Sequence, residues 1–306
     1  MCRMKFLVLG ATFLVSSVFM FWNLENSFDP YDDPLTRDEE FTPGGARHWT
    51  WKKLDRKLTG VAKVILAARD AYGDYPALVG FCEVENATVV RRLATHKLLE
   101  IPGYDWIHRD SPDGRGIDVA LLFRRDKFRP LVVRAVPAPT DPPTRDILYV
   151  KGLLEGDTVH VLVNHWPSKL GGKAGGARRE AAAAALRACV DSIDAASPPV
   201  SSAPIIVMGD FNATPQELVP PPGFENLAAP LAAAGEGSLK YRGTWELIDQ
   251  FWVRRPRTPV RMSVFRLPFL LEPDTGYTGD KPRRTFSGPH YKGGLSDHLP
   301  VVLVWE

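Results

Sequence analysis

The feature that most constrains this chain is a repeated pairing of an apolar run with polar side chains at its end. In the segment IIVMGDFNATP, the apolar run 205–208 stops at Gly209 and is followed by Asp210 and Asn212. An unpaired buried charge is costly, so such a side chain needs solvent, a capping role or a cation. The polar groups that end, lie within or precede six apolar runs are Asn23, Glu83, Asn164 with His165, Asp210 with Asn212, Asp249, and Asp297 with His298. One such event is a corner of the fold, whereas six predict a convergent site at one end of a sheet.

Taken alone, the segment around Asp210 allows two interpretations. In the first, Asp210 or Asn212 caps a helix that begins near Thr214 and Pro215, since proline favours the first helical turn. In the second, the two side chains belong to a metal or phosphate site. The rest of the chain has to decide between them.

Strands and helices alternate along the sequence. Apolar or alternating runs predict strands at residues 18–26, 77–82, 118–123, 147–154, 159–164 and 205–208, and in the late segments WELIDQFWV and LPVVLVW. Helical patterns cover residues 46–71, a short stretch ending near 99, and 176–195. The close spacing of 147–154 and 159–164 predicts an antiparallel hairpin. We therefore expect a mixed sheet with helices outside it.

Charge and composition restrict the function only weakly. The chain has 306 residues, 44% of them apolar, and a formal net charge of +2, which excludes recognition of nucleic acid by bulk charge alone. Residues 251–296 are locally basic, with nine Arg and Lys against three acids, which suits an anionic substrate or a solvated loop. The stretch SKLGGKAGGARR, residues 168–179, is either a loop that grips phosphate or a linker into the next helix. Three widely spaced cysteines suggest neither a disulfide framework nor a CxxC metal site.

The N-terminal segment allows two interpretations. Residues 6–24 carry no charge, a length that suits a signal peptide or a membrane anchor, yet residues 18–26 also look like a first core strand. We interpret residues 1–17 as a signal peptide or N-terminal extension and residues 18–306 as one domain. Export to the periplasm or medium is favoured over a cytoplasmic location.

The residue types indicate a hard cation. Mg²⁺ prefers carboxylate and amide oxygens and partners phosphates, whereas zinc would call for more histidine and cysteine. The oxygen-bearing candidates are Asn23, Glu83, Asp210, Asn212 and Asp297. His165 and His298 are then free to act as acid and base.

The ordered motifs FWNLEN, GFCEVEN, RGIDVALLFR, VNHWPS, VMGDFNATP, IDQFWV and LSDHLPV resemble the endonuclease/exonuclease/phosphatase superfamily, which has the deoxyribonuclease I-like fold. The resemblance spans residues 21–304. It implies an α/β (α+β) fold that forms a four-layer α/β sandwich, with two packed mixed β-sheets flanked by helices. It also implies a phosphoesterase site at the open edge of the sandwich.

The resemblance further implies roles for the metal-side residues. Glu83 corresponds to the principal Mg²⁺ ligand, with Asn23 and Asp297 close to the metal. Asp210 and Asn212 correspond to the pair that positions the attacking water and contacts the scissile phosphate.

For the remaining residues, His298 corresponds to the general base or phosphate-polarising imidazole, oriented by Asp249. His165 would stabilise developing charge or protonate the leaving oxygen. We take Arg115, Asn164 and Lys169 as the substrate-binding residues.

These inferences lead to a function hypothesis. We expect a Mg²⁺-dependent phosphodiesterase, with Mn²⁺ as an alternative ion, which hydrolyses nucleic acid as a monomer with no stable protein partner. A phosphatase, or a lipid or inositol-phosphate phosphodiesterase of the same fold, is the alternative within the enzyme class. A catalytically silent phosphate-binding module is the alternative outside it.

Overall fold

The computed structural model describes residues 17–169, 172–196 and 203–306. The predicted signal peptide or extension, residues 1–17, lies outside these ranges except for Ser17, which begins the first strand. Part of the linker at 197–204 also lies outside them. In the described ranges, no helix combines the length and the apolar character that a membrane span requires.

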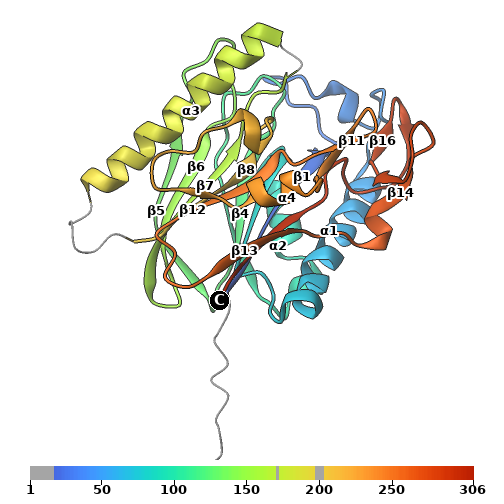
Figure 1. The fold of residues 1–306 in the computed structure, drawn as a ribbon. Helices are drawn as coiled ribbons and strands as arrows, with labels where there is room; N and C mark the ends of the chain where they lie inside the picture. The colour runs from blue at the N-terminus through green and yellow to red at the C-terminus, as the bar shows by residue number, and fades with distance from the viewer. Residues whose placement is uncertain (1–16, 170–171, 197–202) are drawn as a thin grey trace, which may run out of the picture.

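Two six-stranded sheets form the centre of the molecule (Figure 1). The first sheet has the strand order β13 (Val260–Val264), β18 (Val301–Trp305), β1 (Ser17–Ser27), β2 (Leu78–Val84), β4 (Asp118–Arg124) and β3 (Tyr104–His108). The second has the order β5 (Phe128–Val136), β6 (Ile147–Leu154), β7 (Asp157–His165), β8 (Ile205–Asp210), β12 (Asp249–Arg254) and β9 (Glu225–Asn226). Both sheets mix parallel and antiparallel pairs, as predicted.

The helices and short elements surround the sheets. The α-helices are α1 (Trp51–Tyr72), α2 (Ala87–Ala94), α3 (Gly172–Ala195) and α4 (Ala228–Ala233). Single 3-10 turns occur at η1 (Glu39–Phe41), η2 (Lys97–Leu99), η4 (Pro215–Glu217) and η5 (Pro268–Leu270). Three small hairpins pair β10 (Leu239–Tyr241) with β11 (Thr244–Glu246), β14 (Leu271–Pro273) with β15 (Asp280–Pro282), and β16 (Phe286–Ser287) with β17 (His290–Tyr291).

Three buried clusters separate four layers. Along β1, Met20 and Trp22 pack with α1 and α2, whereas Phe19 and Phe21 face the second sheet, because successive strand residues point to opposite sides. A third cluster, which includes Leu186, lies between the second sheet and α3. Figure 1 shows α3 lying against that sheet. Each fully buried large apolar side chain contributes about 1.5–3 kcal/mol. The predicted four-layer α/β sandwich is confirmed.

Close packing between the sheets also explains one glycine. A Cβ on Gly80 of β2 would lie 2.5 Å from Sδ of Met208 in β8. A side chain at position 80 would therefore require the Met208 side chain to move.

Some predicted boundaries were wrong. α1 begins at Trp51 and not near residue 46, because the Thr50 side chain accepts a hydrogen bond from the Lys53 amide and caps the helix there. Four strands of the two large sheets, β3, β5, β9 and β13, were not predicted. The stretch 168–179 is not a loop throughout, since α3 already begins at Gly172.

The corner after β8 gives a further correction. Thr214, and neither Asp210 nor Asn212, precedes the 3-10 turn η4, and its amide donates to the Glu217 carboxylate at 2.7 Å. This arrangement is a capping box. The proposed capping role of Asp210 and Asn212 is therefore excluded, which leaves their side chains for the site.

Candidate active site

Strand direction brings the polar groups together. β1 and β2 run parallel, as do β7 and β8, so their carboxyl ends lie at one edge of the sandwich. β12 and β18 run antiparallel to their neighbours and begin at the same edge. In the second sheet, Asp210 of β8 is the strand partner of both His165 in β7 and Asp249 in β12, so these three residues are adjacent. The polar groups of the six apolar runs therefore lie at one edge of the sandwich.

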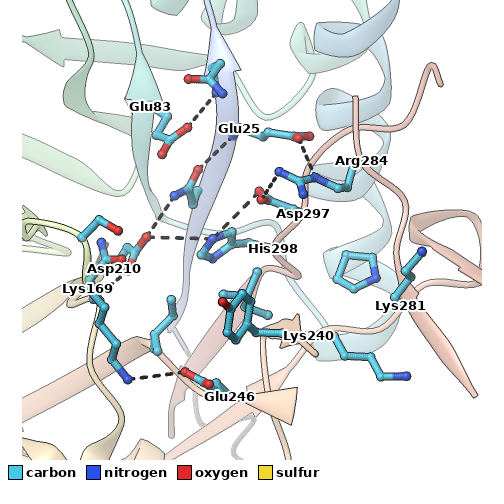
Figure 2. Close-up of a pocket in the computed structure, with 18 of the residues that line it drawn as sticks. Glu25, Glu83, Lys169, Asp210, Lys240, Glu246, Lys281, Arg284, Asp297 and His298 are labelled. Carbon is cyan, nitrogen blue, oxygen red and sulfur yellow. Dashed lines mark hydrogen bonds and ion pairs between the residues drawn. The ribbon is translucent and has the colours of Figure 1, made fainter. Parts of the chain in front are cut away.

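A cavity of about 810 Å³ opens at this edge. Nine of the eleven predicted site residues line it: Asn23, Glu83, Arg115, His165, Lys169, Asp210, Asn212, Asp297 and His298. Figure 2 shows Glu83, Asp210, Asp297 and His298 around one space, with Lys169 and Glu246 on the side away from Glu83.

Asn164 does not reach the cavity. It shares a face of β7 with Leu162, which packs on the α3 side, whereas His165 shares its face with Val163, which packs between the sheets. The Asn164 side chain is fully buried and donates to the Leu162 carbonyl, while its oxygen accepts from Nε1 of Trp166. Substrate binding by Asn164 was therefore a wrong prediction, and the residue supports the strand behind the site.

Asp249 lies directly behind His298. Its Oδ2 is 2.7 Å from Nδ1 of His298 and also accepts a hydrogen bond from the Ser238 hydroxyl at 2.5 Å. Because an ionised carboxylate only accepts, the Nδ1–H of His298 donates, and Nε2 faces the cavity. Nε2 is 4.0 Å from Asp210 and 3.9 Å from Asp297.

These contacts set the charge of His298. Burial lowers its pKa, but the carboxylates of Asp249, Asp210 and Asp297 outweigh burial and raise the pKa well above the usual value. The imidazole is therefore cationic at neutral pH in this arrangement.

His165 is the opposite case. Its Nε2 lies 3.9 Å from Glu83 and 3.8 Å from Asp210, while within the described chain its Nδ1 has no hydrogen-bond partner. Burial, with help from the positive charges of Arg145, Arg115 and His298, lowers the pKa of His165 well below the usual value. His165 is therefore a neutral imidazole that can donate one N–H into the cavity.

Asp210 is held from two sides. Nδ2 of Asn23 donates to its Oδ2 at 3.0 Å, and the amide of Asn212 donates to its Oδ1 at 2.9 Å. Burial, and then the nearby charge of Asp249, raise the pKa of Asp210 to about 7. A carboxylate with this pKa can accept a proton from water near neutral pH.

Backbone geometry re-aims several side chains at this edge. The non-glycine residues Glu25, Asn26, Glu83 and Asn212 have φ between 43° and 58°. Strict alternation from Phe81 would turn Glu83 toward the helices, but the register of β2 shifts between Cys82 and Val84, and Glu83 lines the cavity. Such left-handed residues cost about 1–3 kcal/mol each and cluster at functional sites.

Glu25 is a site residue that sequence reasoning missed. It is 6% exposed and accepts hydrogen bonds from Nε of Arg284 and the Thr285 amide, at 3.1 and 2.6 Å. Arg284 also pairs with Asp297 at 2.9 Å, so its guanidinium joins the two carboxylates. Glu25 follows Asn23 by two residues, and this strand spacing was the available signal.

A buried lysine supports the same corner. Nζ of Lys57, from α1, donates to the Glu25 carbonyl at 2.6 Å and to the Thr285 hydroxyl at 2.8 Å. Burial lowers the pKa of Lys57 to about 8.

Arg145 is a second cation that the sequence analysis missed. It lines the cavity while its guanidinium donates to Asp113 and to the Trp166 carbonyl. No pattern in the Pro-rich segment before β6 singled it out.

The donor set fits a hard divalent cation. Four carboxylates, those of Glu25, Glu83, Asp210 and Asp297, line one cavity, and burial together with neighbouring acids raises the pKa of Glu25 and Asp210. One Glu83 oxygen accepts from the Asn26 amide at 2.9 Å, which leaves the other for a ligand. Excess negative charge of this kind is relieved by a cation with oxygen preference.

Three other groupings of possible ligands occur among the described residues, and one of them, His108 with Asp110 and Asp118, does not line the cavity. Asp210, Asp249 and His298 offer atoms within 4.8 Å of one another, as do Cys82, His165 and Asp210. In the first group Asp249 and His298 already bond each other, and in the second burial raises the pKa of the Cys82 thiol well above its usual value. Glu83 and Asp297 belong to none of these groupings but line the same cavity.

The two packed mixed sheets and the cavity at their edge define a phosphoric ester hydrolase. A sequence model of the endonuclease/exonuclease/phosphatase family matches residues 18–306, and the chain belongs to this family. No curated protein matches the sequence.

Solved structures share the fold at low identity. TDP2 from C. elegans is 15% identical, with a TM-score of 0.62 over 95% of this chain and 75% of that one. D. rerio TDP2 in complex with a single-strand DNA product is 15% identical, with a TM-score of 0.59 over 95% and 98% of the two chains. The human Nocturnin catalytic domain with bound sulfate is 19% identical, with a TM-score of 0.58 over 94% and 92%.

Proposed function

We propose that the protein is a Mg²⁺-dependent phosphodiesterase that hydrolyses nucleic acid, with Mn²⁺ able to replace Mg²⁺. The observation that supports this most strongly is the gathering of Glu83, Asp210, Asp297, His165 and His298 around one cavity. A cation held by Glu83 and Asp297, with Asn23 beside them, would polarise a phosphate oxygen.

The side chains suggest a division of labour. Asp210, oriented by Asn23 and Asn212, accepts the proton of the attacking water. His298 acts as a charged donor to the phosphate, because the carboxylate of Asp249 keeps it protonated. This choice between base and charged stabiliser follows from the raised pKa of His298.

His165 and the flanking cations complete the proposal. Neutral His165 donates a hydrogen bond to a second phosphate oxygen. Arg115 lines the cavity and donates to Asn26 at 2.6 Å, and Lys169 pairs with Glu217 at 2.8 Å. Both cations remain available to a substrate phosphate by exchange of partners, since their present bonds are at an exposed rim.

Nucleic acid is the favoured substrate class. One neighbour with this fold was crystallised with a single-strand DNA product. The cavity of about 810 Å³ is also larger than a single phosphate needs, and cations line its outer part.

The test is an activity panel in Mg²⁺ or Mn²⁺ on DNA and RNA strands, plasmid DNA, bis-p-nitrophenyl phosphate and p-nitrophenyl phosphate. The proposal predicts turnover of both diester classes and little of the monoester. Turnover of the monoester alone would establish a phosphatase instead. No turnover of any substrate would favour the catalytically silent phosphate-binding module.

A further inference from the structure

Two hairpins form the outer wall of the cavity and brace each other. Nζ of Lys240 in β10 donates to the carbonyls of Thr278 and Asp280, at 2.7 and 3.2 Å, in and after the β14–β15 turn. Lys240 also pairs with Asp274 at 3.1 Å. A Cβ on Gly243 would lie 2.7 Å from the Tyr277 ring, so the two hairpin tips are in direct contact. These contacts hold the two hairpins against each other as one wall.

Two aromatic rings on this wall are open to solvent. Tyr241 is 50% exposed and Tyr277 is 53% exposed, and both line the cavity. The guanidinium carbon of Arg242 lies 5.3 Å from the centre of the Tyr241 ring. Exposed aromatic rings in a cleft that is otherwise charged mark a surface that binds something flat and apolar.

The β10–β11 hairpin of the wall is hydrogen-bonded to the segment that carries His298. Leu239 forms a β-bridge with His298, and the Leu299 amide donates to the Ser238 carbonyl at 2.7 Å. Tyr241 follows Leu239 by two residues on the same face, which places it about 7 Å along the strand from the level of His298. A group bonded next to a phosphate at His298 can therefore reach the ring.

The charges of the wall suit a polyanion. On the two hairpins, Lys240, Arg242 and Lys281 line the cavity with Glu246 and Asp274, and Lys169, which follows β7, brings the excess to two positive charges. Figure 2 shows Lys240 and Lys281 on the side of the cavity away from Glu83.

We propose that Tyr241 and Tyr277, with Arg242, form a stacking platform for an unpaired nucleobase next to the scissile phosphate. This inference rests on the proposed function and specifies its substrate class, which is single-stranded nucleic acid or an unpaired end. In a duplex the bases are stacked inside and their faces are not available to a protein ring. Stacking on aromatic side chains is tolerant of sequence, so no preference for one base is required.

The test compares Tyr241→Ala and Tyr277→Ala with two controls. Tyr241→Phe keeps the ring, and Tyr31→Ala removes a tyrosine that is 67% exposed but does not line the cavity. The readout is kcat/KM on a single strand, the matched duplex, and a strand of abasic nucleotides, with DNA and RNA run in parallel.

We expect each alanine variant to lose about 5- to 150-fold on the normal single strand. The loss should be absent on the abasic strand. Tyr241→Phe, which keeps the stacking ring, should lose much less than Tyr241→Ala, and Tyr31→Ala should stay close to wild type. Equal loss on the abasic strand, wild-type rates in both alanine variants, or a preference for duplex would overturn the platform. If no nucleic acid is cleaved while bis-p-nitrophenyl phosphate is, the proposed function itself fails.

Discussion

Nδ1 of His298 lies 2.7 Å from the carboxylate of Asp249, at a depth where Asp249 is fully buried. The pair joins two sheets, since Asp249 begins β12 of the second and His298 precedes β18 of the first. The Ser238 hydroxyl fixes the same Asp249 oxygen. This bond sets both the tautomer and the charge of the imidazole, and the first prediction depends on it.

Replacing His298 with Ala should lower kcat by about 10²–10⁴, the usual effect of removing a positioned proton or charge donor. Because the imidazolium is the active form, wild-type activity should fall as the pH rises through the raised pKa of His298. Asp249→Asn should cost less and move this descending limb to lower pH, since it removes the charge that raises the pKa. A pH–rate profile on bis-p-nitrophenyl phosphate measures both effects. A limb that rises with pH and depends on His298 would identify the residue as a base.

Asp210 should control the ascending limb of the pH–rate profile. The carboxylate accepts a proton only when ionised, so activity should rise with pH through the pKa of Asp210, which is about 7 without a bound cation. A nearby cation lowers that pKa, and the limb should then lie at or below pH 7. Asp210→Asn should remove the limb together with about 10²–10⁴ of the rate. An unchanged ascending limb in this variant would rule out Asp210 as the base.

Arg284 should matter much more than its neighbour Arg283. Arg284 joins Glu25 and Asp297, whereas the Arg283 guanidinium donates to the Lys292 carbonyl. We predict that Arg284→Gln lowers turnover of a small diester and of a nucleic-acid strand alike, by about tenfold or more, because it removes the guanidinium that pairs with the buried Glu25 carboxylate. Arg283→Gln is the matched control and should stay within about twofold on the small diester. Similar losses in both variants would count against the special role of Arg284.

His160 should make folding sensitive to acid. Its Nδ1 lies 2.9 Å from the Tyr149 hydroxyl, and burial, aided by Lys151 and Arg254, lowers its pKa to about 4. The unfolded chain has a histidine pKa of about 6.5. The stability that neutral His160 contributes is therefore complete above pH ~6.5 and is lost as the pH falls toward 4. Urea unfolding from pH 7.5 to 4.5, values chosen to bracket this window, should show a steeper fall for wild type than for His160→Gln. Parallel curves would contradict the buried neutral state.

The sequence was most informative where strands are fully buried. β1, β8 and β18 are buried along nearly their whole length and appear as continuous apolar runs. β5 lies at a sheet edge with mostly exposed residues and contains a proline, so it gave no such signal. β3 is only five residues long and has a mixed pattern.

The site was predictable for the same reason. Polar groups at the ends of buried runs identified Asp210, His165 and His298, because strand direction carries run ends to one edge. The orientation of Glu83 depends on a left-handed backbone conformation that no apolar pattern encodes. The wall of Tyr241 and Tyr277 depends on contacts between two hairpins, which no motif in the sequence brings together.

The central claim is that Glu83 and its oxygen-bearing neighbours hold a divalent cation on which hydrolysis depends. Its most direct measurement is turnover of bis-p-nitrophenyl phosphate after EDTA treatment, as Mg²⁺ is added back to wild type and to Glu83→Gln. We predict that EDTA abolishes wild-type turnover and that Mg²⁺ restores it. Glu83→Gln, with wild-type circular dichroism, should stay inactive at the same Mg²⁺ concentration. Full turnover in EDTA, or full recovery of Glu83→Gln, would contradict the claim.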